Sequence, residues 1–94
     1  MHRCILSRGA MKSLRRIPKA RVEQIMKAFD GLAATENLVE HRNVTAMKGD
    51  WLGLYRIRIG SYRAFFEVNP DPKATPQEKL LLLSIESIGS RGGI

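Results

Sequence analysis

The sequence predicts a two-layer α+β fold, with an N-terminal strand and a helical hairpin packed on one face of a mainly antiparallel sheet. Hydrophobic residues recur with helical spacing through residues 7–33 and alternate with polar residues from residue 54 onward. The turn-forming pair Gly60-Ser61 separates two of these alternating runs. Helices therefore precede antiparallel strands, an order typical of a sheet with helices on one face and the other face uncovered.

Length and composition favour a single soluble domain over residues 1–94. A chain of 94 residues has room for one hydrophobic core, because a second core needs more surface to bury. No apolar run approaches the roughly 18 residues of a membrane span, so we expect no membrane partner. The single cysteine, Cys4, cannot form an intramolecular disulfide, which favours a cytoplasmic location and a structural thiol.

The N-terminal part predicts a strand followed by two helices. Residues 2–6 form a short apolar run, and Ser7 is a suitable N-cap for a helix that Pro18 ends. The apolar face of this helix consists of Ala10, Leu14 and Ile17. A second helix is expected at residues 19–33, with an apolar stripe for packing on the sheet. The stripe consists of Val22, Ile25, Met26, Phe29 and Leu32.

The rest of the chain predicts one long loop and three strands. Residues 34–52 show no sustained period, so we expect a loop with a short extended piece near residues 44–47. Residues 69–79 are polar and contain three prolines, which cannot continue a strand ladder. The expected strands are residues 54–59, 62–68 and 80–88, the last so apolar that a central position is favoured.

Positive charge is concentrated at the N-terminal end. The net charge is +7, and residues 1–21 contain seven basic and no acidic residues. Transit peptides share this composition, but the helical spacing of the apolar residues favours a packed segment. A basic surface attracts nucleic acid or an acidic protein, and composition alone does not choose between them.

The predicted hairpin places three arginines on the uncovered face. With Gly60-Ser61 as the loop, Arg58 pairs with Arg63 and Arg56 with Phe65. Like charges directly across a ladder destabilise it, so an anionic ligand is indicated. The alternative is a solvated charged face that Glu67 partly neutralises. Arginine suits phosphate because its planar group donates two parallel hydrogen bonds. Phe65 offers a surface for base stacking, or simply packs in the sheet.

Two segments resemble the RelE/ParE toxin superfamily of bacterial toxin-antitoxin modules. They are Met47-Lys48-Gly49 and the run LYRIRIGSYR at residues 54–63. The run AMKSL at residues 10–14, the tripeptide Ile17-Pro18-Lys19 and the closing segment 85–91 are also similar, so the resemblance covers nearly the whole chain. It implies a toxin that a cognate antitoxin protein neutralises.

The RelE-type members imply a more specific activity, which is ribosome-dependent cleavage of mRNA. In them, basic residues bind the scissile phosphate while the neighbouring 2′-hydroxyl attacks it, without metal or cofactor. By resemblance, Arg56 and Arg58 are paired basic sites, Arg63 clamps the phosphate and Arg91 is a basic position after the last strand. Their shared role would be charge stabilisation of the transition state. Lys48 and Phe65 are further candidates for contacting RNA.

One departure from the RelE pattern leaves three functions open. Many RelE-type ribonucleases carry a tyrosine or histidine near the C-terminus, whereas this sequence ends in Gly92-Gly93-Ile94. His2, His41 and Tyr62 are each expected to be structural. The functions are an mRNA endonuclease, a ParE-type toxin that inhibits DNA gyrase by contact, and a degenerate member that binds only its antitoxin. Operator DNA would be bound only through the antitoxin complex.

Overall fold

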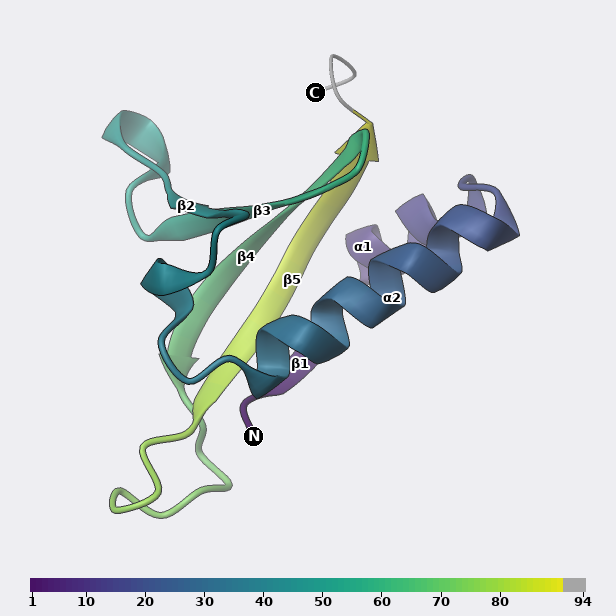
Figure 1. Cartoon of the computed structure of the whole chain (residues 1–94). Coiled ribbons are helices and arrows are strands. Elements are labelled where there is room, and N and C mark those ends of the chain that lie inside the picture. Colours follow the sequence, from purple (N-terminus) through teal and green to yellow (C-terminus); the bar gives the residue numbers. More distant parts are fainter. Residues whose placement is uncertain (91–94) are drawn as a thin grey trace.

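A five-stranded sheet forms one layer of the computed structural model, which describes residues 1–90, and two helices form the other (Figure 1). The strands are β1 (Arg3–Leu6), β2 (Val44–Ala46), β3 (Leu54–Ile59), β4 (Tyr62–Pro70) and β5 (Leu81–Ser90). Their order across the sheet is β1-β5-β4-β3-β2. β1 is parallel to β5 and the other neighbours are antiparallel, so the sheet is mixed but mainly antiparallel, as predicted.

Both predicted helices are present, and the first is shorter than expected. They are α1 (Arg8–Arg15) and α2 (Lys19–Ala34). The Oγ of Ser7 caps α1 by accepting a hydrogen bond of 3.0 Å from the amide of Ala10. Ile17 was expected in this helix but lies beyond its end, because a residue that precedes proline is disfavoured in the helical conformation. No helix among residues 1–90 combines the length and apolarity that crossing a bilayer requires.

One hydrophobic core lies between the helices and the sheet. Ala10 from α1 and Phe29 from α2 are buried there against Phe66 from β4. Side chains alternate between the two faces of a strand, so every second residue of β3 and β4 enters this core. The sheet contributes Ile57, Ile59, Ala64, Phe66, Leu83, Ile85 and Ile88.

The β3–β4 hairpin has the predicted register. Ile59 pairs with Tyr62 and Arg58 with Arg63, and the ladder continues to Leu54 opposite Glu67. Gly60 has a φ of 60°, a left-handed conformation that glycine adopts without a Cβ clash. The extended piece of the preceding loop is β2, flanked by the short 3₁₀ helices η1 (Leu38–Glu40) and η2 (Gly49–Trp51). β5 is an interior strand as expected, although β4 holds the middle of the sheet. Both strands are longer than predicted: β4 continues to Pro70 opposite Leu81, at the strand end where a proline is tolerated, and β5 continues to Ser90 opposite Tyr62.

An irregularity in the β4–β5 ladder leaves one residue of β5 without a partner. Phe65 pairs with Ser87 and Phe66 pairs with Ile85, so Glu86 is the extra residue of a β-bulge. Ser7 holds this bulge against the start of α1. Its Oγ donates to the Glu86 carbonyl at 2.8 Å and its amide donates to the Ile85 carbonyl at 2.9 Å. One serine therefore caps a helix and fixes the shape of an interior strand.

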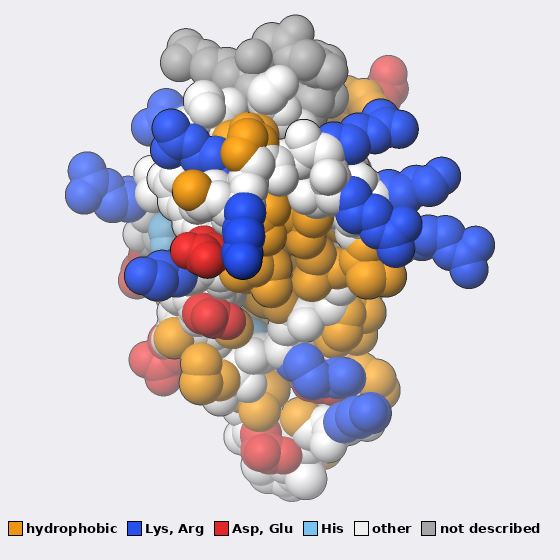
Figure 2. All heavy atoms as spheres, turned by 90° about the vertical axis from the view of Figure 1, so that its right-hand side faces the viewer, with side chains coloured by type: hydrophobic (Ala, Val, Ile, Leu, Met, Phe, Trp, Pro, Cys, Tyr) orange, Lys and Arg blue, Asp and Glu red, His pale blue; other side chains and the backbone are white. Residues whose placement is uncertain are grey.

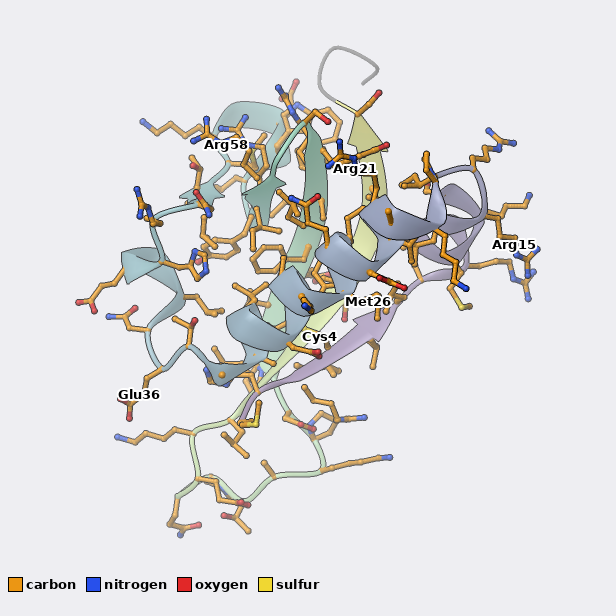
Figure 3. The ribbon with its side chains drawn as sticks, turned by 45° about the vertical axis from the view of Figure 1, so that its right-hand side comes forward. Cys4, Arg15, Arg21, Met26, Glu36 and Arg58 are labelled. Atoms are coloured by element: carbon orange, nitrogen blue, oxygen red, sulfur yellow. The ribbon has the colours of Figure 1, made fainter. Side chains whose placement is uncertain are left out.

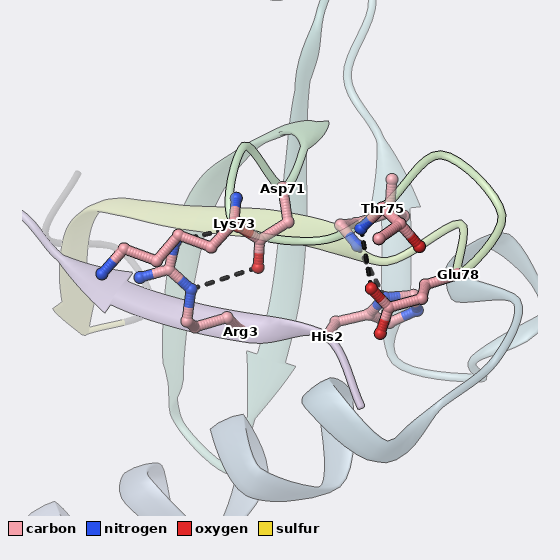
Figure 4. Close-up of polar contacts among 7 residues, drawn as sticks. His2, Arg3, Asp71, Lys73, Thr75 and Glu78 are labelled. Atoms are coloured by element: carbon pink, nitrogen blue, oxygen red, sulfur yellow. Dashed lines mark hydrogen bonds and ion pairs between the residues drawn. The ribbon is translucent and has the colours of Figure 1, made fainter.

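A bidentate ion pair ties the edge strand β1 to the loop between β4 and β5 (Figure 4). The Nε and Nη2 of Arg3 donate to the two carboxylate oxygens of Asp71 at 3.1 and 2.9 Å. The amide of Lys73 donates to the same carboxylate at 2.9 Å. These hydrogen bonds, with that from Arg3 the strongest influence, lower the pKa of Asp71 to about 2.

Neighbouring phenylalanines of β4 provide a test of the assignment of faces. Phe66 is fully buried, so Phe66→Ala is expected to lower the free energy of unfolding by about 3–5 kcal/mol. Phe65 points to the uncovered side, and Phe65→Ala is expected to cost less than about 1 kcal/mol. Urea denaturation followed by circular dichroism measures both values, with Phe66→Leu as a milder variant. Equal losses at the two positions would contradict the assignment.

The ion pair predicts a stability difference that disappears in acid. Because folding lowers the pKa of Asp71, its contribution is fully present above the unfolded pKa near 4 and is lost as the pH falls toward 2. Wild type is therefore expected to have a higher urea midpoint than Asp71→Asn at about pH 5, and the difference should shrink by about pH 2. A gap that does not change with pH would show that Asp71 stabilises the fold by other means.

Candidate phosphate-binding face

The surface of the sheet that faces away from α1 and α2 carries the predicted site residues. We call this surface the open face. It is formed by the residues that alternate with the core residues of each strand. From β3 it receives Leu54, Arg56 and Arg58, from β4 it receives Arg63, Phe65 and Glu67, and from β5 it receives Ser84 and Ser87.

Three arginines lie together on the open face without a carboxylate partner. Arg58 is directly opposite Arg63, and Arg56 is on the same strand two residues before Arg58. Within the described residues, no ion pair involves any of these guanidinium groups. Arg58 is exposed, and Figure 3 shows it on the side of the sheet remote from Arg15 of α1. The opposed pair costs a few tenths of a kcal/mol or more, so the cluster is not explained by stability.

A pocket of about 390 Å³ lies on the open face beside the arginines. We call it the open-face pocket. Arg63 and Phe65 line it from β4, and Glu86 lines it from the bulge of β5. Trp51, which follows β2, lines it from the far side although 60% of its surface is exposed. The complete lining is Met47, Trp51, Leu54, Arg63, Phe65, Glu86 and Ser87.

The pocket contains residues that the sequence alone did not single out. Trp51 is the only tryptophan of the chain and lies in a polar loop, which is a signal that sequence reasoning had available. Glu86 gave no such signal, because its place beside Arg63 depends on the pairing of β5 with β4 and on the bulge. Phe65 was predicted as a stacking surface or as packing. It is half-buried and contributes its side chain to the pocket wall.

Of the predicted site residues, only Arg63 and Phe65 line the pocket, while Arg56 and Arg58 share its face without lining it. Lys48 is exposed just before η2 and does not belong to the pocket lining. Arg91 lies outside the described residues, so its position relative to Arg63 is not defined. The geometry therefore assembles Arg56, Arg58, Arg63 and Phe65 and leaves the other two candidates apart.

The remaining polar candidates have structural roles. The Nδ1 of His2 accepts from the amide of Leu81 at 3.0 Å, and the Nδ1 of His41 accepts from the amide of Asn43 at 3.1 Å. Tyr62 packs against the core. Burial, with a smaller influence of a nearby carboxylate, raises the pKa of Cys4 to about 11, so this thiol stays protonated at neutral pH.

The part of the chain that the structure describes contains no cluster of three potential metal ligands. This search covers histidine, cysteine, aspartate and glutamate side chains among residues 1–90. The open face does carry two carboxylates, Glu67 and Glu86, but they come from different strands and only Glu86 lines the pocket.

A second basic surface lies on the helical side of the molecule. Figure 2 shows this side, where an area of hydrophobic side chains has lysine and arginine side chains beside it. Met11 of α1 and Met26 of α2 are both exposed. Neither helix has an acidic residue in its first turn, although a negative charge there would favour the helix dipole. The exposed basic residues of α1, of α2 and of the turn between them are Arg8, Lys12, Arg15, Arg16, Lys19, Arg21 and Lys27.

Most of the chain matches the model of one known protein family. The family model described as the ParE toxin of the type II toxin-antitoxin system parDE matches residues 4–87. This chain belongs to that family. The match confirms the superfamily that the segments at residues 47–49 and 54–63 resemble. A comparison with curated protein sequences gave no match.

Solved structures share the fold over nearly the full chain. An archaeal RelE in a RelE-RelB complex from Pyrococcus horikoshii OT3 is 26% identical with a TM-score of 0.70, covering 97% of this chain and 96% of that chain. A chain of the RelBE2 complex from Mycobacterium tuberculosis is 16% identical with a TM-score of 0.73, covering 96% and 91%. The isolated RelE toxin of E. coli is 16% identical with a TM-score of 0.68, covering 100% and 88%.

The opposed arginines predict a substitution that stabilises the free chain. Replacing Arg58 by glutamine removes the repulsion with Arg63 and is expected to raise the free energy of unfolding by up to about 1 kcal/mol at low ionic strength. The gain should shrink at about 1 M NaCl, because salt screens charges at the surface. Arg42→Gln, at an exposed loop position before β2, is the control and should change little. A loss of stability in Arg58→Gln would contradict the idea that the pair is unfavourable.

Proposed function

We propose that the open face binds the phosphate backbone of RNA and that this toxin is an endonuclease cleaving mRNA in the ribosomal A site. The observation that carries the proposal is the cluster of Arg56, Arg58 and Arg63. These guanidinium groups share one uncovered sheet face, have no ion-pair partner among the described residues and include a directly opposed pair. An anion between Arg58 and Arg63 would convert their repulsion into two attractions.

The arginines suit a cleavage in which RNA supplies its own nucleophile. The ribose 2′-oxygen forms a bond to phosphorus while the bond from phosphorus to the 5′-oxygen breaks. The products are a 2′,3′-cyclic phosphate and a free 5′-hydroxyl. Negative charge accumulates on the phosphoryl oxygens in the transition state, and fixed guanidinium donors stabilise it. Arg63 is half-buried beside the pocket, so less motion is lost when it binds than for the exposed Arg58.

The roles of Lys48 and Arg91 in this reaction are also proposals. Lys48 lies in the loop beside η2, where it can contact RNA that extends beyond the pocket. Arg91 follows the end of β5 and would add a fourth positive charge to the cleavage site. Metal and cofactor are not needed in this scheme, because arginine alone supplies the charge stabilisation. Arginine does not exchange protons near neutral pH, so other groups must move them.

We further propose that a cognate antitoxin holds the toxin inactive in the cytoplasm. The solved RelE from Pyrococcus horikoshii is in a complex with RelB, which supports such a partner. The basic residues of α1 together with exposed Met11 and Met26 suit an acidic amphipathic segment. Covering the arginines of the open face would inactivate the toxin directly. Operator DNA would be bound only through the antitoxin in this complex.

A second candidate function is inhibition of DNA gyrase by contact. The matching family model is that of ParE toxins, which favours this candidate. The described part of the open face also has no histidine or tyrosine side chain, since Tyr55 and Tyr62 pack toward the core. A toxin without chemistry needs no such group. A degenerate member that only binds its antitoxin is the third possibility.

Controlled expression separates these three functions. The gene is induced from a tightly repressed promoter, the 5′ ends of cellular mRNA are mapped, and supercoiling by purified gyrase is assayed in parallel. New ends within translated codons are the result expected of the nuclease. Growth arrest with intact messages and lost supercoiling would replace the nuclease with the gyrase inhibitor. Unimpaired growth, with soluble protein present, would favour the degenerate member.

The phosphate-clamping role of Arg63 predicts a loss of toxicity without a loss of fold. Arg63→Ala is expected to abolish growth arrest and to lower the rate of mRNA cleavage by at least about 100-fold, the usual effect of removing a donor to a transition-state anion. The circular dichroism spectrum and the binding of the antitoxin should be retained. Arg42→Ala, at an exposed loop arginine before β2 that does not line the pocket, should stay toxic. A fully toxic Arg63→Ala would overturn the assignment of the cleavage site.

A further inference from the structure

We propose that the open-face pocket is a nucleobase site that selects guanine, with Glu86 as the residue that determines the selection. This inference rests on the proposed function, because it assigns a base to the RNA whose phosphate the arginines hold. The pocket combines an aromatic wall, a carboxylate and a guanidinium group within one cavity of about 390 Å³. Cavities of roughly this size accommodate small ligands.

The apolar side of the pocket suits the flat face of a base. Trp51 and Phe65 come from different segments and both line the cavity, with Met47 and Leu54 beside them. Trp51 is 60% exposed, so its ring is accessible to a ligand in the pocket. Stacking on aromatic side chains is how proteins hold single-stranded RNA bases, and it is tolerant of base identity. The stacking surface therefore provides affinity and leaves selection to the polar groups.

The bulge of β5 brings Glu86 to the lining of this pocket. Glu86 is the unpaired residue of the bulge, and bulges commonly redirect a side chain beside a functional site. Its backbone is held by Ser7, whose Oγ donates to the Glu86 carbonyl at 2.8 Å. The backbone that carries the carboxylate is therefore fixed by α1.

The chemistry of a carboxylate selects one base among four. A carboxylate only accepts hydrogen bonds, and its two oxygens match two parallel N–H donors. On the Watson–Crick edge guanine offers such a pair, N1–H and the 2-amino group. Adenine and cytosine each place an acceptor nitrogen next to their amino group, and uracil flanks its single N–H with two carbonyls. Glu86 would therefore pair with guanine and repel the acceptors of the other bases.

Arg63 links the base site to the cleavage site. It lines the same pocket as Glu86 and stands opposite Arg58 in the hairpin. A nucleotide with its base between Trp51 and Phe65 would thus have its phosphate near the arginine cluster. The positive and negative groups of the pocket match the phosphate and the donor edge of a guanosine nucleotide.

Nucleotide titrations of the purified chain test this directly. Because Trp51 is the only tryptophan, its indole N–H gives a single NMR signal that reports on the pocket. Guanosine 5′-monophosphate is expected to shift this signal with at least about tenfold higher affinity than adenosine 5′-monophosphate. Inosine 5′-monophosphate, which lacks the 2-amino donor, should bind between the two.

A matched pair of glutamate variants assigns the selection to Glu86. Glu86→Gln should reduce the preference for the guanine nucleotide to within about twofold, because the neutral amide accepts less well from guanine and no longer repels the acceptor of adenine. Glu67→Gln, on the same face but not among the pocket residues, should retain the wild-type preference. Equal binding of both nucleotides by wild type, or an unchanged preference in Glu86→Gln, would overturn the proposal.

Mapped cleavage sites distinguish failure of this inference from failure of the proposed function. If messages are cut without enrichment of guanine beside the cut, the nuclease stands and the guanine site falls. If guanine nucleotide binds selectively but no message is cut, the pocket stands and the nuclease falls. Slower cutting at every codon in Glu86→Gln, with the same base preference, would give Glu86 a role in proton transfer and would also overturn the selection.

Discussion

The strict alternation of side chains along β4 is the constraint on which the rest of the structure depends. Ala64 and Phe66 are fully buried, while Arg63 and Phe65 point to the opposite face. A slip of one residue would bury the guanidinium group of Arg63 in the core and expose Phe66, at a cost of several kcal/mol. Because β4 is the middle strand, its orientation also sets the faces of β3 and β5. The core and the arginine cluster are thus two results of the same alternation.

Two sets of polar contacts hold the N-terminal segment against the rest of the sheet. Ser7 joins the start of α1 to the bulge in β5, and Arg3 joins β1 to the loop at Asp71. Both lie at or near β1, a short parallel edge strand of four residues that each pair with β5. These contacts place the N-terminal segment against the C-terminal strand. They also make the conformation of Glu86, on the open face, depend on a residue that caps a helix on the other side.

Charge is distributed in this molecule in a way that local stability does not favour. Arg58 faces Arg63 across the hairpin, and both helices begin without an acidic residue. Each feature costs a few tenths of a kcal/mol or more, amounts that a domain with this core can tolerate. The two basic regions lie on different sides of the molecule. We interpret the open face as the surface for RNA and the helical side as a docking surface for an acidic antitoxin, whose chain must also cover the open-face arginines to inactivate the toxin.

The sequence by itself determined the elements, the hairpin register and the family. Apolar spacing predicted both helices, and Gly60-Ser61 predicted a register that the structure has throughout β3 and β4. These features are local, so neighbouring residues are enough to specify them. The arginine cluster followed from the same register. Several boundaries were misjudged. Ile17 continues the apolar spacing although Pro18 prevents it from continuing the helix. β4 continues to Pro70 and β5 to Ser90, because pairing between these two strands holds residues beyond the alternating runs.

Tertiary structure alone decided the pocket. Its lining comes from the loop after β2, from β3 and β4, and from the bulge of β5. Met47 and Ser87, the first and last of these residues in the sequence, are 40 residues apart. The sequence of residues 81–90 fits several registers. It therefore predicts neither how β5 pairs with β4 nor where the bulge lies. Ile85 and Ile88 are both buried in the core, and the amide of Ser7 holds the carbonyl of Ile85. The bulge allows β5 to make these contacts together. A side chain such as Glu86 acquires its neighbours from these distant contacts, and a sequence read locally does not contain them.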